Sequence, residues 1–182
     1  MISSEKYIER LVKEWKKHDK IIIACDYDDT ICKWSMDSDY KHVIETLKKA
    51  KQLGAYIVIW TASNYIERES NIRLFCSNNG IEIDSINKNP VDLPFGNHGK
   101  IYANIYIDDR GGLNESIYIL EESIRRVVDD KLISEYKKYN DFISEELGEL
   151  AVMASVRGWT SSRHEEGIKY RQRINQLELL KK

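Results

Sequence analysis

The clearest pattern in this chain is a set of short apolar runs without regular alternation. They cover residues 21–25 (IIIAC), 55–60 (AYIVIW) and 103–109, where ANIYI ends in two aspartates. Such runs are typical of parallel strands covered on both faces. Between the first two, apolar residues recur at helical spacing over 43–50, and Gly54 follows as a C-terminal cap. A strand, a helix and a strand in succession predict a parallel sheet with right-handed crossovers.

The remaining segments extend this pattern in both directions. Residues 3–17 predict an amphipathic helix with Ile8, Leu11, Val12 and Trp15 on its apolar face, and 65–79 predict another helix. A short strand is expected within 81–86. From residue 114 the pattern changes to long helices, the last of which begins at a capping box formed by Ser162 and Glu165.

These elements predict an α/β fold, a doubly wound, Rossmann-like parallel sheet followed by a helical extension. We place the sheet domain at residues 1–128 and the extension at 129–182. The extension should form an antiparallel helical pair. Its apolar face, with Leu147, Leu150, Val152, Met153 and Val156, should pack on the core or on a second copy in a homodimer.

Composition narrows the environment and the partners. The formal net charge of -2, from 28 basic and 30 acidic residues, provides no overall attraction to nucleic acid or to an anionic membrane. Three cysteines without a CxxC motif describe neither a disulfide framework nor a zinc site. No apolar run is long enough to span a bilayer, and the N-terminus has no signal-peptide core. We therefore expect a soluble, cytoplasmic protein without a membrane partner.

Acidic residues follow two of the predicted strands. Asp26 and Asp28 end the first, Asp108 and Asp109 end the last, and Thr61 follows the middle one. Because the carboxyl ends of parallel strands share one edge of a sheet, these groups should meet there. Carboxylates this close repel one another, and hard oxygen ligands suit Mg²⁺. The sequence therefore predicts a magnesium site at that edge.

Three motifs resemble those of the haloacid dehalogenase (HAD) superfamily of phosphatase-like hydrolases. DYDDT after a strand resembles its DxDxT signature, IVIWT resembles its second motif, and IYIDD resembles its acidic fourth motif. The resemblance covers roughly residues 20–125 in the correct order, and HGKIYANIYIDDRG is similar to small phage and bacterial members. The segments after the first two motifs are too short for a folded cap domain, so a capless HAD-like core is expected.

The resemblance implies a mechanism for phosphomonoester hydrolysis. Asp26 would be the nucleophile that forms an aspartyl-phosphate, and Asp28 the general acid and base. Thr61 would hold a phosphate oxygen, and Lys100, or alternatively Lys88, would neutralise the phosphate.

The resemblance also implies how Mg²⁺ would be held. Asp26, the backbone carbonyl of Asp28 and Asp108 would bind the ion, and Asp109 would orient its waters. Among the neighbouring charged residues, we interpret Asp29 as a solvated loop residue and Arg110 as a structural partner of the acids.

The substrate hypothesis depends on the absence of a cap. Specificity should come from loops around Trp34, Asn64, Lys88 and Asn97, and an aromatic residue such as Trp34 or Tyr65 could stack on a base. A nucleotide or the phosphorylated end of a nucleic acid is therefore favoured over a sugar phosphate or another small phosphomonoester.

Three alternatives remain open from the sequence. A receiver-like signalling module also combines an acidic pair with a metal, but its phospho-accepting aspartate would stand where this chain has Thr61. Half of the metal-binding pattern of all-helical nucleotide pyrophosphohydrolases is matched by Glu145, Glu146 and Glu149. Its second half is absent after Glu165 and Glu166, so a solvated helix face is the better explanation of these residues. A HAD-like fold used only for binding or assembly is the third.

Overall fold

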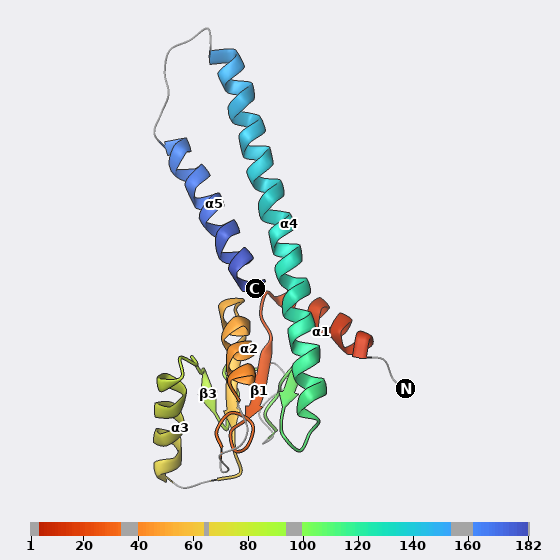
Figure 1. The fold of residues 1–182 in the computed structure, drawn as a ribbon, viewed down its shortest axis with the longest axis vertical. Helices are drawn as coiled ribbons and strands as arrows, with labels where there is room; N and C mark the ends of the chain where they lie inside the picture. The colour runs from red at the N-terminus through yellow and green to blue at the C-terminus, as the bar shows by residue number, and fades with distance from the viewer. Residues whose placement is uncertain (1–3, 34–39, 64–65, 94–99, 154–161, 182) are drawn as a thin grey trace. The chain divides into compact units, whose positions relative to one another are not determined.

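The described part of the chain forms four strands and five helices (Figure 1). The computed structural model describes residues 4–33, 40–63, 66–93, 100–153 and 162–181. The elements follow the order α1 (Ser4–His18), β1 (Ile22–Asp26), α2 (Lys41–Gln52), β2 (Tyr56–Trp60), α3 (Ile66–Asn78), β3 (Ser85–Ile86), β4 (Ile105–Ile107), α4 (Leu113–Met153) and α5 (Ser162–Leu180). All strands are parallel, in the order β3-β2-β1-β4. This α/β architecture is compatible with the predicted Rossmann-like fold.

The two inner strands supply the centre of the core. In β1, Ile23, Ala24 and Cys25 are fully buried, and residues 57–59 of β2 are equally inaccessible. Burial of successive residues means that both faces of these strands are covered, as the non-alternating runs predicted. The predicted apolar face of α1 is also buried, and its Trp15 donates a hydrogen bond from Nε1 to the Leu53 carbonyl at 3.3 Å.

The two edge strands are shorter than their sequences predicted, for the same reason. Asp84 precedes β3, and its Oδ2 accepts the hydrogen bond of the Ile57 amide at 2.7 Å. Asn104 precedes β4, and its Oδ1 accepts from the Ile22 amide, also at 2.7 Å. In both cases a side chain satisfies a backbone donor of the inner strand at the start of the pairing, so the regular ladder begins one residue later.

The strand order reverses between β1 and β4. From β1 the chain moves outward through β2 to β3, whereas β4 returns to pair with the other side of β1. Open parallel sheets bind ligands outside the carboxyl ends of the strands at this kind of reversal. The residues that follow β1 and β4 are those of the two acidic motifs, so the topology alone brings them together.

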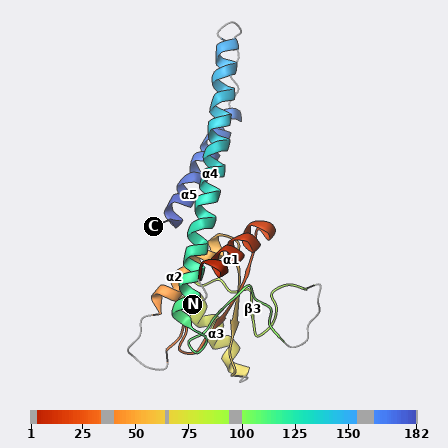
Figure 2. The same ribbon diagram turned by 90° about the vertical axis from the view of Figure 1, so that its right-hand side faces the viewer.

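The chain divides into two compact units, residues 1–124 and 125–182. The division falls within the continuous helix α4, four residues before the boundary that we predicted from the sequence. In the second unit, α5 lies alongside the second half of α4 in both views (Figures 1 and 2). No helix in the described ranges is both long and apolar enough to cross a membrane.

The helical pair is antiparallel, as predicted. Arg171 donates to the Tyr139 hydroxyl at 2.8 Å, and Lys181 pairs with Asp129 at 2.7 Å. Residues later in the chain after α5 begins therefore meet earlier residues of α4, as in two antiparallel helices. Ile174 and Leu177 are buried within this unit. The predicted interface residues lie outside the side chains that the structure describes, as does the proposed capping hydroxyl of Ser162. These residues are Leu147, Leu150, Val152, Met153 and Val156.

Candidate functional site

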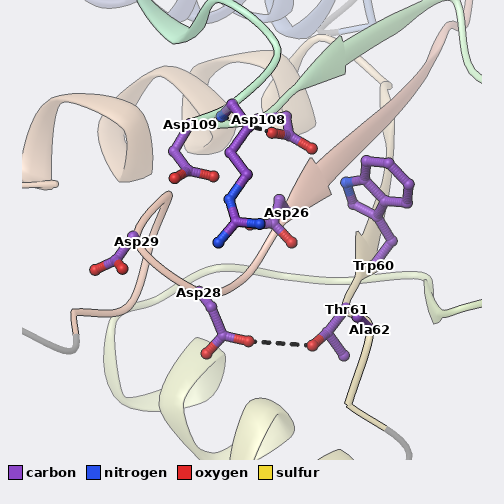
Figure 3. A pocket seen from close by; sticks show the side chains of 9 residues that line it. Asp26, Asp28, Asp29, Trp60, Thr61, Ala62, Asp108 and Asp109 are labelled. Carbon is purple, nitrogen blue, oxygen red and sulfur yellow. Dashed lines mark hydrogen bonds between the residues drawn. The ribbon is translucent and has the colours of Figure 1, made fainter.

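A pocket of about 380 Å³ lies at the carboxyl edge of the sheet (Figure 3). Residues that follow β1 and β4 line it, together with the end of β2. The lining consists of Asp26, Asp28, Asp29, Trp60, Thr61, Ala62, Asp108, Asp109 and Arg110. Five of the six residues that we predicted to carry catalysis or bind metal are therefore together, and they come from three adjacent strands.

The turn after β1 places Asp26 and Asp28 on the same pocket. The Tyr27 amide continues the ladder by donating to the Trp60 carbonyl at 3.2 Å, and the chain then folds back as the Ile31 and Cys32 amides both donate to the Tyr27 carbonyl. Asp29 has a φ of 54°, a left-handed conformation that aspartate tolerates better than most residues. The chain thus leaves the extended conformation after Tyr27, and both carboxylates line the same pocket.

The fully buried Thr30 links the two acidic motifs. Its hydroxyl lies 3.4 Å from Asp26 Oδ2, to which it can donate, and it accepts the hydrogen bond of the Asp109 amide at 3.0 Å. A hydroxyl can donate and accept at the same time, which a buried apolar residue could not do here. Thr30 thereby fixes the loop after β4 relative to the carboxylate at the end of β1.

Asp26 has an unusually high pKa for an aspartate. Partial burial raises it, and the nearby carboxylates of Asp108, Asp109 and Asp28 raise it further, although a hydrogen bond from the Tyr27 amide opposes them; the pKa moves from 3.8 to about 6. The folded structure therefore penalises the ionisation of this carboxylate. A cation bound beside it would remove much of that penalty.

Asp108 is held by the turn that follows it. Its Oδ1 accepts hydrogen bonds from the amides of Arg110 at 2.8 Å and Gly111 at 3.0 Å. A side chain at position 111 would bring a Cβ to 3.2 Å from Asp108 Cβ, so glycine allows the turn to close this tightly. With Oδ1 engaged by the backbone, Asp108 Oδ2 is the atom available to a ligand.

Asp28 is bound by two side chains from different elements. Its Oδ2 accepts from the Thr61 hydroxyl at 3.2 Å, the contact drawn in Figure 3, and its Oδ1 is paired with the Arg68 guanidinium. Arg68 comes from the first turns of α3 and also lies over the Tyr27 ring, with its guanidinium carbon 4.8 Å from the ring centroid. Ion pairing and the aromatic face together fix the guanidinium beside Asp28.

Thr61 is itself fixed by Asn87, directly after β3. The Asn87 side chain accepts from the Thr61 amide at 2.8 Å and donates to the Thr61 carbonyl at 3.0 Å. The backbone of Asn87 is left-handed, with a φ of 52°, and its amide bonds the Ile59 carbonyl at 2.9 Å. This reciprocal pair connects the end of β3 to Thr61, whose hydroxyl in turn binds Asp28 after β1.

We did not predict Arg68 and Asn87 from the sequence. Applying the rule of strand ends to the short third strand would have identified Asn87, because it immediately follows β3. Arg68 had a weaker signal, its position near the start of the helix that follows Thr61. A residue's place on a helix does not reveal which charge it meets, so the pairing with Asp28 required the structure.

The predicted cations are placed differently from the predicted acids. Lys100 and Lys88 are both exposed and are not part of the pocket lining. Asp29, interpreted as a solvated loop residue, lines the pocket, as does Arg110. Arg110 touches Asp108 through its backbone amide rather than through its guanidinium. The predicted substrate-contacting residues Trp34, Asn64, Tyr65 and Asn97 lie outside the described ranges.

The donor set fits Mg²⁺. Among the described residues, no three carboxylate, histidine or cysteine side chains are close enough to enclose a metal ion by themselves. Mg²⁺ does not require such a cage, because protein sites hold it through one or two carboxylates and leave several waters in place. The residues that would hold it are Asp26 and Asp108, with the backbone carbonyl of Asp28, and Asp109 would contact its waters. The raised pKa of Asp26 is consistent with a pocket built to receive a cation.

Comparisons with protein-family models, curated proteins and solved structures find no match to this chain. A function for this chain can therefore be inferred only from the geometry of the pocket and from the resemblance of its motifs.

Proposed function

We propose that this chain is a magnesium-dependent phosphomonoester hydrolase of the HAD type that acts through an aspartyl-phosphate. One observation carries the proposal: Asp26, Asp28, Thr61, Asp108 and Asp109 line a single pocket at the reversal point of a parallel sheet. These residues end or follow three adjacent strands, β2, β1 and β4. Their order along the chain is that of the three motifs.

The arrangement supports a reaction in two steps. A carboxylate oxygen of Asp26 attacks phosphorus as the bond to the leaving oxygen breaks, and Asp28 donates a proton to that oxygen. In the second step Asp28 accepts a proton from water, whose oxygen displaces Asp26 and forms inorganic phosphate. A bound Mg²⁺ supplies charge neutralisation between the phosphoryl group and Asp26.

The contacts of Asp28 hold its carboxyl group in place, and the ion pair with Arg68 favours the ionised form that accepts a proton from water in the second step. Thr61 and Arg68 bind its two oxygens from different directions, which restricts rotation of the carboxyl group. An acid that donates to a leaving group must already be aligned with it, and small misplacements are costly. Thr61 in turn is restrained by Asn87, so the side of the pocket formed by β2 is fixed from its neighbouring strand.

The substrate class remains the proposal that we drew from the sequence. The pocket volume lies at the small end of the range for ligand sites, which suits a phosphoryl group with part of its alcohol. The indole of Trp60 lines the pocket and provides an aromatic surface next to Thr61. This favours a nucleotide or the phosphorylated end of a short oligonucleotide over a hexose phosphate.

Turnover of p-nitrophenyl phosphate with and without Mg²⁺ tests the reaction. Asp26→Asn should lower kcat by several orders of magnitude, because the amide is not a nucleophile and carries no negative charge. Asp92→Asn is the matched control, because Asp92 is exposed and does not line the pocket. The proposal fails if Asp26→Asn, shown to be folded by circular dichroism, retains near-normal turnover, or if the wild type turns over nothing in Mg²⁺.

Substrate choice requires a second comparison. The values of kcat/KM for a deoxynucleoside monophosphate, a 3′-phosphorylated oligonucleotide and a hexose phosphate should favour the first two. A tenfold preference for the hexose phosphate would leave the hydrolase proposal intact but would reverse the substrate ranking.

A further inference from the structure

The pocket has an imbalance of charge that its proposed substrate would make worse. Five carboxylates line it, from Asp26, Asp28, Asp29, Asp108 and Asp109, and the lining contains a single positively charged side chain. A phosphomonoester adds up to two negative charges. One divalent cation beside Asp26 cannot neutralise all of these groups, so a positive side chain of the protein must face the phosphate.

The other candidate cations do not meet this requirement. Arg68 is near the pocket, but its guanidinium is already paired with Asp28 and packed over the Tyr27 ring. Lys100 and Lys88 are exposed and are not part of the lining. A lysine that neutralises a transferring phosphoryl group has to reach the same cavity as the nucleophile.

Arg110 meets the requirement. Its backbone is fixed to the pocket, because its amide donates to Asp108 Oδ1 at 2.8 Å, and the adjoining Gly111 amide binds the same oxygen. The residue is exposed and lines the pocket. Among the residues that the structure describes, its guanidinium makes no hydrogen bond or ion pair. An anchored backbone with an uncommitted guanidinium is suited to a ligand that enters from solvent.

We propose that the guanidinium of Arg110 binds the phosphoryl oxygens of the substrate, in the role that the HAD resemblance assigned to Lys100. The planar guanidinium can donate two parallel hydrogen bonds to a phosphate, which a lysine ammonium cannot match. Arg110 is then a substrate-binding residue rather than a structural partner of the acids. The inference deepens the proposed function and rests on it.

Binding of inorganic phosphate in Mg²⁺, measured by isothermal titration calorimetry, tests Arg110 without requiring turnover. Arg110→Met should weaken phosphate binding about ten- to a hundredfold, the range for a lost charged hydrogen-bond donor, and Arg110→Lys should recover part of the loss. Arg73→Met is the control, because this exposed arginine pairs with Glu69 on α3. It should bind phosphate like the wild type.

Lys100→Met separates the two assignments. If Lys100→Met abolishes phosphate binding while Arg110→Met leaves it unchanged, the assignment to Arg110 is wrong. The same conclusion follows if the wild type binds no phosphate at millimolar concentrations. If phosphate binding depends on Arg110 but p-nitrophenyl phosphate is not hydrolysed, the anion site stands and only the hydrolase proposal fails.

Discussion

Arg68 and Asp28 form an ion pair that joins α3 to the loop after β1. The pair is mostly sheltered, since the side chains are only 22% and 32% exposed, and Tyr27 lies beneath the guanidinium. Tyr27 in turn meets Phe75 of α3 edge to face, with ring centroids 5.5 Å apart. An ion pair to Asp28 and an aromatic contact to Tyr27 therefore fix α3 against the loop that carries the predicted catalytic aspartates.

Replacing Arg68 with methionine should reduce both stability and turnover. Asp28 would lose a charged partner in a partly buried position, which should lower the free energy of unfolding by about 1–2 kcal/mol. The freed carboxyl group would rotate, so kcat should fall tenfold or more while KM changes less. Urea denaturation and steady-state kinetics measure the two effects.

Arg73→Met serves as the control for a surface arginine on the same helix. Arg73 and Glu69 form an exposed pair one turn apart, so its loss should change stability by less than about 0.5 kcal/mol. Arg68→Lys, which keeps the charge, should recover part of the lost kcat. Equal effects of Arg68→Met and Arg73→Met would contradict the role of the sheltered pair.

The sequence predicted the fold well where apolar patterns were long and unambiguous. The runs that became β1 and β2 were recognisable because both faces of these strands are buried. The lengths of the edge strands were overestimated. At the start of each, the side chain of Asp84 or Asn104 accepts the hydrogen bond of an inner-strand amide that a backbone carbonyl would accept in a regular ladder. The pattern of apolar residues cannot predict these side-chain hydrogen bonds, because they depend on which backbone amide of the neighbouring strand lies opposite.

The acids of the site were predictable and their partners were not. Asp26 and Asp108 follow strands directly, and strand order alone brings them to one edge of the sheet. Arg68 lies on α3, and its place on a helix does not reveal which charge it meets. Asn87 lies in a left-handed turn, which the sequence pattern does not specify. For the phosphate-neutralising cation, Lys100 precedes β4 and Arg110 follows it, and of these two residues only Arg110 lines the pocket.

The raised pKa of Asp26 predicts a cost in stability at neutral pH. The folded state holds the proton up to about pH 6, whereas an unfolded aspartate releases it near 3.8. The folded protein therefore binds more protons between these values, and the free energy of unfolding should fall as pH rises through this window. Without metal, the protein does not regain this stability at higher pH.

Asp26→Asn should accordingly stabilise the metal-free protein at pH 7.5. The gain should be about 1 kcal/mol once partial exposure to solvent is taken into account, and it should disappear near pH 4. Urea denaturation in a chelator at both pH values measures it, and Mg²⁺ should reduce the difference by favouring the ionised wild type. A variant less stable than the wild type at pH 7.5 would contradict the cause given for the shift.

Asn87 should affect catalysis through Thr61 even where stability is preserved. Asn87→Ala removes both hydrogen bonds to the Thr61 backbone and leaves a Cβ on a residue with a φ of 52°. Asn87→Gly removes the same bonds but accepts this φ without strain, so it should be more stable than the alanine variant by about 1 kcal/mol. Both should lower kcat similarly, because Thr61 loses its support in each, and thermal denaturation with steady-state kinetics separates the two effects. Asn79→Ala, which removes one side-chain bond to the Phe75 carbonyl at the end of α3, should leave kcat unchanged. If activity across the three variants simply followed their stability, Asn87 would be a structural turn residue and would not position Thr61.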